Sequence, residues 1–122
     1  MYRLKIIDSF SAAHQLLGYA GNCESLHGHN WKVEVQVRGE HVNSIGIVID
    51  FKELKRLTKA VLDRFDHGML NQHEAFGDCN PSSELIARYV YREIAHGLPE
   101  GVVMDSVTVW ESDNAAATYC EP

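Results

Sequence analysis

The sequence predicts an α+β fold in which two helices pack on one face of a four-stranded antiparallel sheet. Apolar and polar side chains alternate near both ends of the chain, which is typical of strands, and helical spacing marks two segments between them. The order of elements is therefore strand, strand, helix, helix, strand, strand. With 122 residues, the chain is long enough for one core and too short for two, so we expect a single domain over residues 1–122.

The first two strands are expected over residues 2–13 and 27–38. The second has the clearer pattern, because His27, His29, Trp31 and the valines that follow at every second position share one face, with polar residues on the other. The glycine-containing segment between the two strands is interpreted as a loop.

The two helices are predicted from capping residues followed by apolar residues at helical spacing. Asp50 opens the first helix, and Glu53 three positions later completes a capping-box pattern. The second helix begins in Pro81-Ser82-Ser83-Glu84 and ends near His96, where a glycine and a proline follow.

The last two strands are expected over residues 102–111 and 115–120. Glu111 continues the apolar row of Val107 and Val109. A carboxylate in that row either reaches solvent at the strand end or accepts hydrogen bonds from a ligand, since burial without a donor is costly. A sheet of this size also has open edges, which favours pairing between subunits.

Composition excludes several classes of function. The formal net charge is −6, from 17 acidic and 11 basic residues, which argues against a nucleic-acid partner. No apolar run reaches the length of a membrane span, so no membrane association is expected. The N-terminal segment lacks a signal-peptide pattern, and three cysteines are too few for a disulfide framework. These features predict a cytoplasmic protein with reduced thiols.

Three histidines are either unrelated residues on a half-polar surface or the ligands of one metal ion, and their positions favour the metal site. His27 and His29 are two residues apart on one strand, so their side chains leave the same face. His14 ends the preceding strand and lies beside them if the two strands pair as a hairpin. Three converging imidazoles with an open position are typical of a catalytic zinc site, although copper, iron and nickel also accept such ligands.

Other reactive residues have two interpretations each. Cys23 precedes His27 by four positions and is either a base or nucleophile activated by a nearby dication or an inert buried thiol. Asp66 and His67 are either an acid–base pair or the end of a helix with His67 at its dipole. Local reasoning favours the helix end, because adjacent residues do not easily bond each other.

Six motifs, taken together and in order, resemble the 6-pyruvoyl tetrahydropterin synthase superfamily. The resemblance covers essentially the whole chain and is strongest to the bacterial branch, the 6-carboxy-5,6,7,8-tetrahydropterin synthases of queuosine biosynthesis. The motifs are Phe10-Ser11-Ala12-Ala13-His14, Cys23-Glu24-Ser25-Leu26-His27-Gly28-His29, Gly46-Ile47-Val48-Ile49-Asp50-Phe51, Asp66-His67 with Leu70-Asn71, Asn80-Pro81-Ser82-Ser83-Glu84 and Val109-Trp110-Glu111.

The resemblance implies an architecture and a metal. Family members have the tunnelling fold (T-fold), in which three subunits close a barrel, two trimers stack into a homo-hexamer, and active sites lie between subunits. By the matching motifs, His14, His27 and His29 would be the ligands of Zn²⁺.

The resemblance also implies a reaction. The substrate would be 7,8-dihydroneopterin triphosphate, with Cys23 as general base, Asp66 and His67 as the second proton-transfer group, and Glu111 binding the pterin ring. In the queuosine branch the products are 6-carboxytetrahydropterin, acetaldehyde and triphosphate.

Two alternatives stay open within the resemblance. Glu24 directly follows Cys23, and some relatives use a glutamate in this motif for folate-pathway cleavage to 6-hydroxymethyldihydropterin. The second alternative is a 6-pyruvoyl tetrahydropterin synthase activity. It is weaker, because three residues separate Cys23 from His27, fewer than in animal members of the family.

Overall fold

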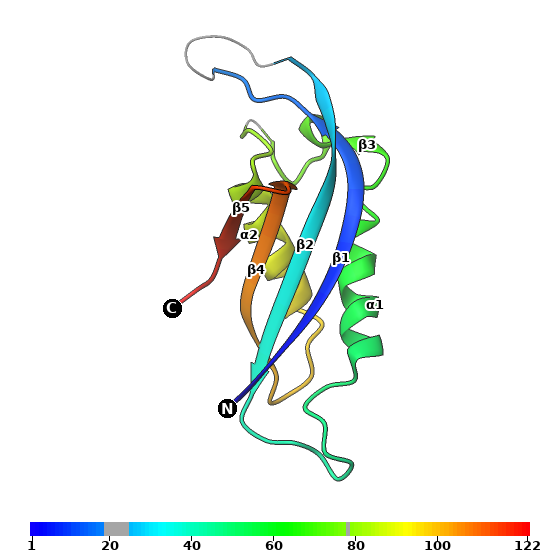
Figure 1. Ribbon diagram of the computed structural model, residues 1–122, viewed down its shortest axis with the longest axis vertical. Helices are drawn as coiled ribbons and strands as arrows, with labels where there is room; N and C mark the ends of the chain where they lie inside the picture. The colour runs from blue at the N-terminus through cyan, green and yellow to red at the C-terminus, as the bar shows by residue number, and fades with distance from the viewer. Residues whose placement is uncertain (19–24, 78) are drawn as a thin grey trace.

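The computed structural model describes residues 1–18, 25–77 and 79–122 and forms a single sheet with two helices (Figure 1). The elements in chain order are strands β1 (Tyr2–His14) and β2 (His27–Gly39), helix α1 (Phe51–Leu62), strand β3 (Gly68–Met69), the 3₁₀ helix η1 (Leu70–Gln72), helix α2 (Ser83–Ala95) and strands β4 (Val103–Ser112) and β5 (Ala115–Tyr119).

The strand order in the sheet is β3-β1-β2-β4-β5. The four long strands pair antiparallel, which confirms the predicted antiparallel core. The prediction of only four strands is wrong, because β3 pairs with β1 in parallel and makes the sheet mixed. Its two residues, Gly68 and Met69, are too few to show an alternation in the sequence.

Antiparallel pairing of β1 and β2 decides which side chains meet at the end of the hairpin. Phe10 lies opposite Trp31, and His14 lies opposite His27. Directly opposed residues of an antiparallel pair project from the same face of the sheet. The row of buried apolar side chains therefore continues without a break into the histidines.

Both helices contribute to one hydrophobic core with that face of the sheet. In Figure 1, α2 lies behind β2 and β4, while α1 runs beside β1. Leu54 of α1 and Ile86 of α2 are fully buried together with Val35 and Val107 from the strands. Among the described residues, no helix combines the length and the apolar character needed to cross a membrane.

The helix starts agree with the predicted caps, with one difference. The Asp50 carboxylate accepts a hydrogen bond from the Lys52 N–H at 2.8 Å, so Asp50 is the N-cap of α1. The reciprocal half of the predicted capping box is not formed, because the Glu53 carboxylate accepts two hydrogen bonds from Arg56 one turn further on. A bidentate, charge-assisted contact is stronger than a bond to the backbone N–H of Asp50.

Candidate metal centre and acid–base pair

The three predicted histidines converge at the end of the β1–β2 hairpin where β1 finishes and β2 begins. The Nε2 atoms of His14 and His27 lie 3.0 Å apart, and the ring centres of His27 and His29 lie 4.5 Å apart. One ligand atom from each of the three histidines and from Glu111 lies within 4.8 Å of all the others. The structure therefore brings together residues that are up to 97 positions apart in the chain (111 − 14).

Hydrogen bonds on the far side of the rings point the Nε2 lone pairs into this cluster. His14 Nδ1 lies 3.0 Å from the carbonyl oxygen of Pro81, and His27 Nδ1 lies 2.7 Å from the carbonyl oxygen of Ser25. A carbonyl can only accept, so Nδ1 carries the proton in both rings and Nε2 presents its lone pair. This arrangement of ligand and outer partner is the one that orients metal-bound histidines.

The cluster has a closed side and an open side. His14 is fully buried, and its ring packs edge-on against the fully buried Trp31, with 4.8 Å between ring centres. His27, His29 and Glu111 are partly exposed. A buried side, formed by His14 and Trp31, with an accessible opposite side suits a metal ion that keeps one position for a substrate.

The donor set fits a zinc ion. Two imidazole nitrogens bound to one tetrahedral zinc at about 2.0–2.1 Å lie about 3.3 Å from each other. The 3.0 Å separation between Nε2 of His14 and Nε2 of His27 is close to that spacing. Neutral imidazole nitrogens and a carboxylate are ordinary zinc ligands.

Glu111 lies closer to the histidines than the sequence indicated. Its Oε1 atom is 3.1 Å from Nε2 of His29 and 3.6 Å from Nε2 of His14. The register of β2 and β4 explains the proximity, because Val33 lies opposite Val109 and the next inward positions are Trp31 and Glu111. The sequence showed the row that contains Glu111, but it did not show that β4 pairs with β2.

Asp66 and His67 form a direct pair, which corrects the expectation that neighbouring residues do not bond each other. His67 Nδ1 lies 2.9 Å from Oδ2 of Asp66. His67 has a φ of 59°, and this left-handed backbone, uncommon outside glycine, turns the ring back toward the preceding side chain. The interpretation as a helix end is also wrong, because α1 ends at Leu62.

The same pair is docked onto strand β1 at Ser11. The Ser11 N–H donates to Oδ1 of Asp66 at 2.8 Å, and the His67 N–H donates to the Ser11 carbonyl at 2.6 Å. The bond from Ser11, with a smaller contribution from His67, lowers the pKa of the Asp66 carboxyl below its ordinary value. Asp66 is therefore an ionised acceptor at neutral pH, and it holds His67 through Nδ1.

The Asp66–His67 pair and the histidine cluster are separate groups within one chain. His67 is 83% exposed, and it is not among the residues whose ligand atoms gather around His14. The predicted residues Cys23 and Glu24 lie outside the described residues.

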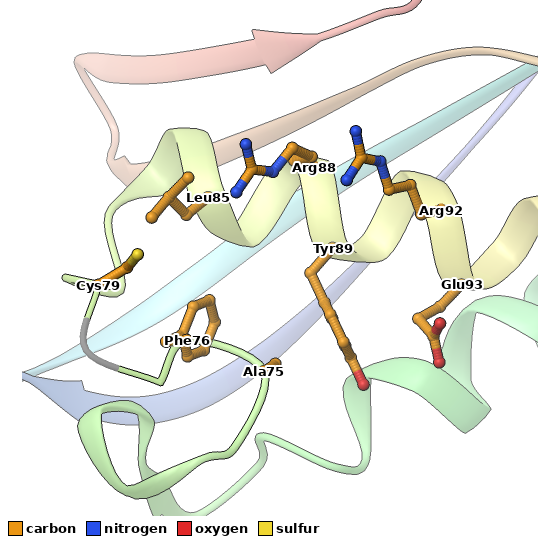
Figure 2. Close-up of a pocket in the computed structure, with 8 residues that line it drawn as sticks. All are labelled: Ala75, Phe76, Cys79, Leu85, Arg88, Tyr89, Arg92 and Glu93. Carbon is orange, nitrogen blue, oxygen red and sulfur yellow. The ribbon is translucent and has the colours of Figure 1, made fainter.

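A cavity of about 190 Å³ opens between α2 and the residues Ala75, Phe76 and Cys79 (Figure 2). Phe76 and Leu85 supply apolar lining, and Arg88 and Arg92 extend from α2 on the side away from Tyr89 and Glu93. None of the predicted site residues that the structure describes lines it. Arg92 donates hydrogen bonds to Glu121 and Tyr119, so its guanidinium group is already partly paired within the protein.

Comparison with known proteins identifies relatives over nearly the full length. A family model described as 6-pyruvoyl tetrahydropterin synthase matches residues 3–122. The 6-carboxy-5,6,7,8-tetrahydropterin synthase of Haemophilus influenzae is 31% identical, with 99% of this chain and 100% of the relative covered.

Two further relatives differ in their named activity. The dihydroneopterin monophosphate aldolase of Pyrococcus furiosus is 35% identical, covering 86% of this chain and 85% of its own. The solved structure of Caenorhabditis elegans 6-pyruvoyl tetrahydropterin synthase superimposes with a TM-score of 0.86 at 30% identity, covering 99% of this chain and 96% of that one.

Proposed function

Because this chain belongs to the 6-pyruvoyl tetrahydropterin synthase family, we propose that it is a zinc-dependent 6-carboxy-5,6,7,8-tetrahydropterin synthase of queuosine biosynthesis. It would convert 7,8-dihydroneopterin triphosphate into 6-carboxytetrahydropterin, acetaldehyde and triphosphate. The observation that supports this proposal most directly is the convergence of His14, His27 and His29 beside the Glu111 carboxylate at an accessible end of the sheet.

His14, His27 and His29 are the residues that would hold the zinc ion. Their carbonyl partners support this role, since Pro81 and Ser25 fix the rings of His14 and His27 with Nε2 inward. When bound, zinc supplies Lewis acidity to the oxygens of the substrate side chain and makes the neighbouring carbon-bound protons easier to remove.

Glu111 is proposed to bind the pterin ring. Its carboxylate can accept hydrogen bonds from the ring N3–H and from the 2-amino group, which together form a two-donor edge that matches two carboxylate oxygens. Glu111 stands at the open side of the histidine cluster. A ring held there would place the reacting side chain next to the metal ligands.

Cys23 and His67 are proposed to move protons. Cys23, which lies four positions before His27 in the sequence, would act as the general base. His67 donates through Nδ1 to the ionised Asp66, so its Nε2 is the atom that would exchange a proton with the substrate. Asp66 would stabilise the imidazolium that forms when Nε2 gains that proton.

The separation of His67 from the metal cluster favours a site shared between subunits. His67 is exposed and is held outward on β1 by Asp66 and Ser11. We propose that it serves the histidine cluster of a neighbouring copy in a homo-hexamer built from two trimers. The outer strands β3 and β5 leave sheet edges available for that assembly.

A second candidate function is cleavage of the dihydroneopterin side chain to 6-hydroxymethyldihydropterin with Glu24 as the base. The adjacency of Cys23 and Glu24 in the sequence favours it, and so does the likeness to the Pyrococcus furiosus aldolase. Comparing turnover and products of Cys23→Ala and Glu24→Gln separates the two, because each reaction needs a different one of these bases.

Metal removal tests the proposed zinc dependence. The protein is purified, its zinc content is measured, and consumption of 7,8-dihydroneopterin triphosphate is followed before chelation, after chelation and after zinc is returned. We expect about one zinc per chain, loss of turnover on chelation and recovery on reloading. Turnover that is unaffected by complete removal of metal would rule out the zinc-dependent reaction.

A further inference from the structure

Two asparagine side chains extend the edge of β1 beyond its pairing with β3. The Gln15 N–H donates to Oδ1 of Asn71 at 2.8 Å, and Nδ2 of Asn71 donates back to the Gln15 carbonyl at 2.7 Å. Asn80 pairs with Leu17 in the same way. The Leu17 N–H donates to Oδ1 of Asn80 at 2.8 Å, and Nδ2 of Asn80 donates to the Leu17 carbonyl at 2.9 Å. Each amide group thus takes the place of a peptide group from a neighbouring strand.

The spacing of these contacts matches an extended strand. Gln15 and Leu17 are two positions apart, so their backbone groups face the same edge. The pairing of Ala12 with Gly68 and of Ala13 with Met69 occupies the preceding part of this edge. Asn71 and Asn80 therefore continue a row of β1 edge contacts over a segment in which β1 itself has ended.

Asparagine is the side chain suited to both positions. One amide donates and accepts in a single plane, as a backbone peptide group does. Aspartate in the same place keeps the acceptor for the N–H but sets a second oxygen against a carbonyl. Such a substitution replaces one of the two hydrogen bonds with a repulsion and barely changes the shape of the side chain.

The segment held in this way begins directly after the buried ligand His14. Asn80 precedes Pro81, whose carbonyl accepts from Nδ1 of His14 at 3.0 Å. Asn80 and Pro81 together therefore hold both the backbone that leaves His14 and the orientation of its ring. Ser82, the next residue, caps α2 by accepting from the Leu85 N–H, which anchors the pair to a rigid element.

We propose that Asn71 and Asn80 are positioning residues of the metal centre, which hold residues 15–17 so that His14 meets His27 and His29 in ligating geometry. The inference rests on the metal-binding part of the proposed function. Asn71, Asn80 and Pro81 would then position His14 for metal binding, in addition to the role of the segment around Pro81 at the start of α2.

The test uses Asn71→Asp and Asn80→Asp, with Asn43→Asp as the matched control. Asn43 lies in the loop between β2 and α1 and uses only Oδ1, which accepts from the N–H groups of Ile45 and Ile47. Aspartate keeps both of those bonds while adding the same charge. Zinc affinity is measured by competition with a chelator, and the visible absorption spectrum of the cobalt-substituted protein reports the ligand geometry.

We expect zinc affinity to fall by about tenfold in Asn71→Asp and Asn80→Asp, as for other residues that orient ligands, with altered cobalt bands. The control should match the wild type in both measurements. Circular dichroism establishes that each variant is folded. If an aspartate variant does not fold, Asn71→Ala or Asn80→Ala takes its place, with water able to solvate the backbone groups and the same direction of change expected.

Wild-type zinc affinity and cobalt spectra in both variants, with only a lowered unfolding temperature, would overturn the proposal and leave the asparagines a purely structural role. Neither readout uses a pterin. The result for Asn71 and Asn80 therefore stands apart from whichever reaction the protein catalyses, and a failure of the proposed activity is recognised separately by turnover.

Discussion

Nδ1 of His67 lies 2.9 Å from Oδ2 of Asp66, although the two residues are adjacent in the chain. The contact depends on the left-handed backbone of His67 and on Ser11, which holds the other carboxylate oxygen. An exposed ring would otherwise sample several rotamers. Asp66 and Ser11 therefore hold an exposed imidazole in one orientation, as the proposed proton transfer by His67 requires.

Asp66→Asn tests this orientation. Asparagine can still accept from the Ser11 N–H, so the backbone contact is retained, but it lacks the negative charge that stabilises a protonated His67. We expect kcat to fall by about 10- to 100-fold, with zinc content unchanged, as measured by steady-state kinetics and elemental analysis. A variant with the wild-type kcat would show that Asp66 does not support catalysis.

Single alanine substitutions of the three histidines test the ligand set. His14→Ala, His27→Ala and His29→Ala each remove one of the converging nitrogens, and a site with two imidazoles holds zinc far more weakly. We expect each purified variant to contain much less than one zinc per chain by elemental analysis. Stoichiometric zinc in any one of them would remove that histidine from the set.

Cys23→Ala tests whether Cys23 is the general base, independently of metal binding. The substitution should leave zinc content unchanged and lower turnover by about 100-fold or more, as expected when a general base is lost. Rate and metal content are measured on the same preparation, so that incomplete loading is not mistaken for lost catalysis. Normal turnover in Cys23→Ala would indicate that Glu24 or another group is the base.

Glu111→Gln tests whether the carboxylate binds substrate or metal. Glutamine has a similar shape but offers one acceptor where the pterin edge needs two. If Glu111 binds the ring, KM should rise by about tenfold or more with zinc retained, since loss of a charged hydrogen-bond partner costs about 1.5–3 kcal/mol. Loss of zinc with an unchanged KM would make Glu111 a ligand instead.

Asp105 provides a pH-dependent test of stability on β4. Hydrogen bonds from Gln36 and then Arg3 lower the pKa of its carboxyl in the folded protein. A lowered folded-state pKa stabilises the fold above the unfolded-state value of about 3.9, and this stabilisation is lost as pH falls through the folded-state value.

Asp105→Asn should therefore lower the free energy of unfolding by about 1 kcal/mol at pH 7. The difference from the wild type should shrink as pH falls below about 4. Urea unfolding at a series of pH values measures both. A difference that stays constant down to the lowest pH would show that the charge of Asp105 is not responsible.

The convergence of His14, His27 and His29 was predictable from sequence because it depends on local regularities. His27 and His29 share a strand face by the two-residue period, and a hairpin between consecutive strands brings His14 beside them. Glu111 was harder to place, because β4 pairs with β2 although both helices lie between these strands in the sequence. No spacing rule in the sequence reports which strands separated by two helices become neighbours.

Other features depend on single backbone angles or single amide groups, which leave no periodic signal. The direct Asp66–His67 contact is formed where His67 has a positive φ. The contacts of Asn71 and Asn80 with the β1 extension join residues 56 and 63 positions apart through side-chain amides. Asparagine at a loop position has many common roles, so its identity alone does not reveal such a contact.

The most direct test of the proposed activity is to incubate the zinc-loaded protein with 7,8-dihydroneopterin triphosphate and identify the products by mass spectrometry. We expect 6-carboxytetrahydropterin together with acetaldehyde, and loss of both in Cys23→Ala. Formation of 6-hydroxymethyldihydropterin in their place would contradict it, and would make Glu24 the base of a side-chain cleavage reaction.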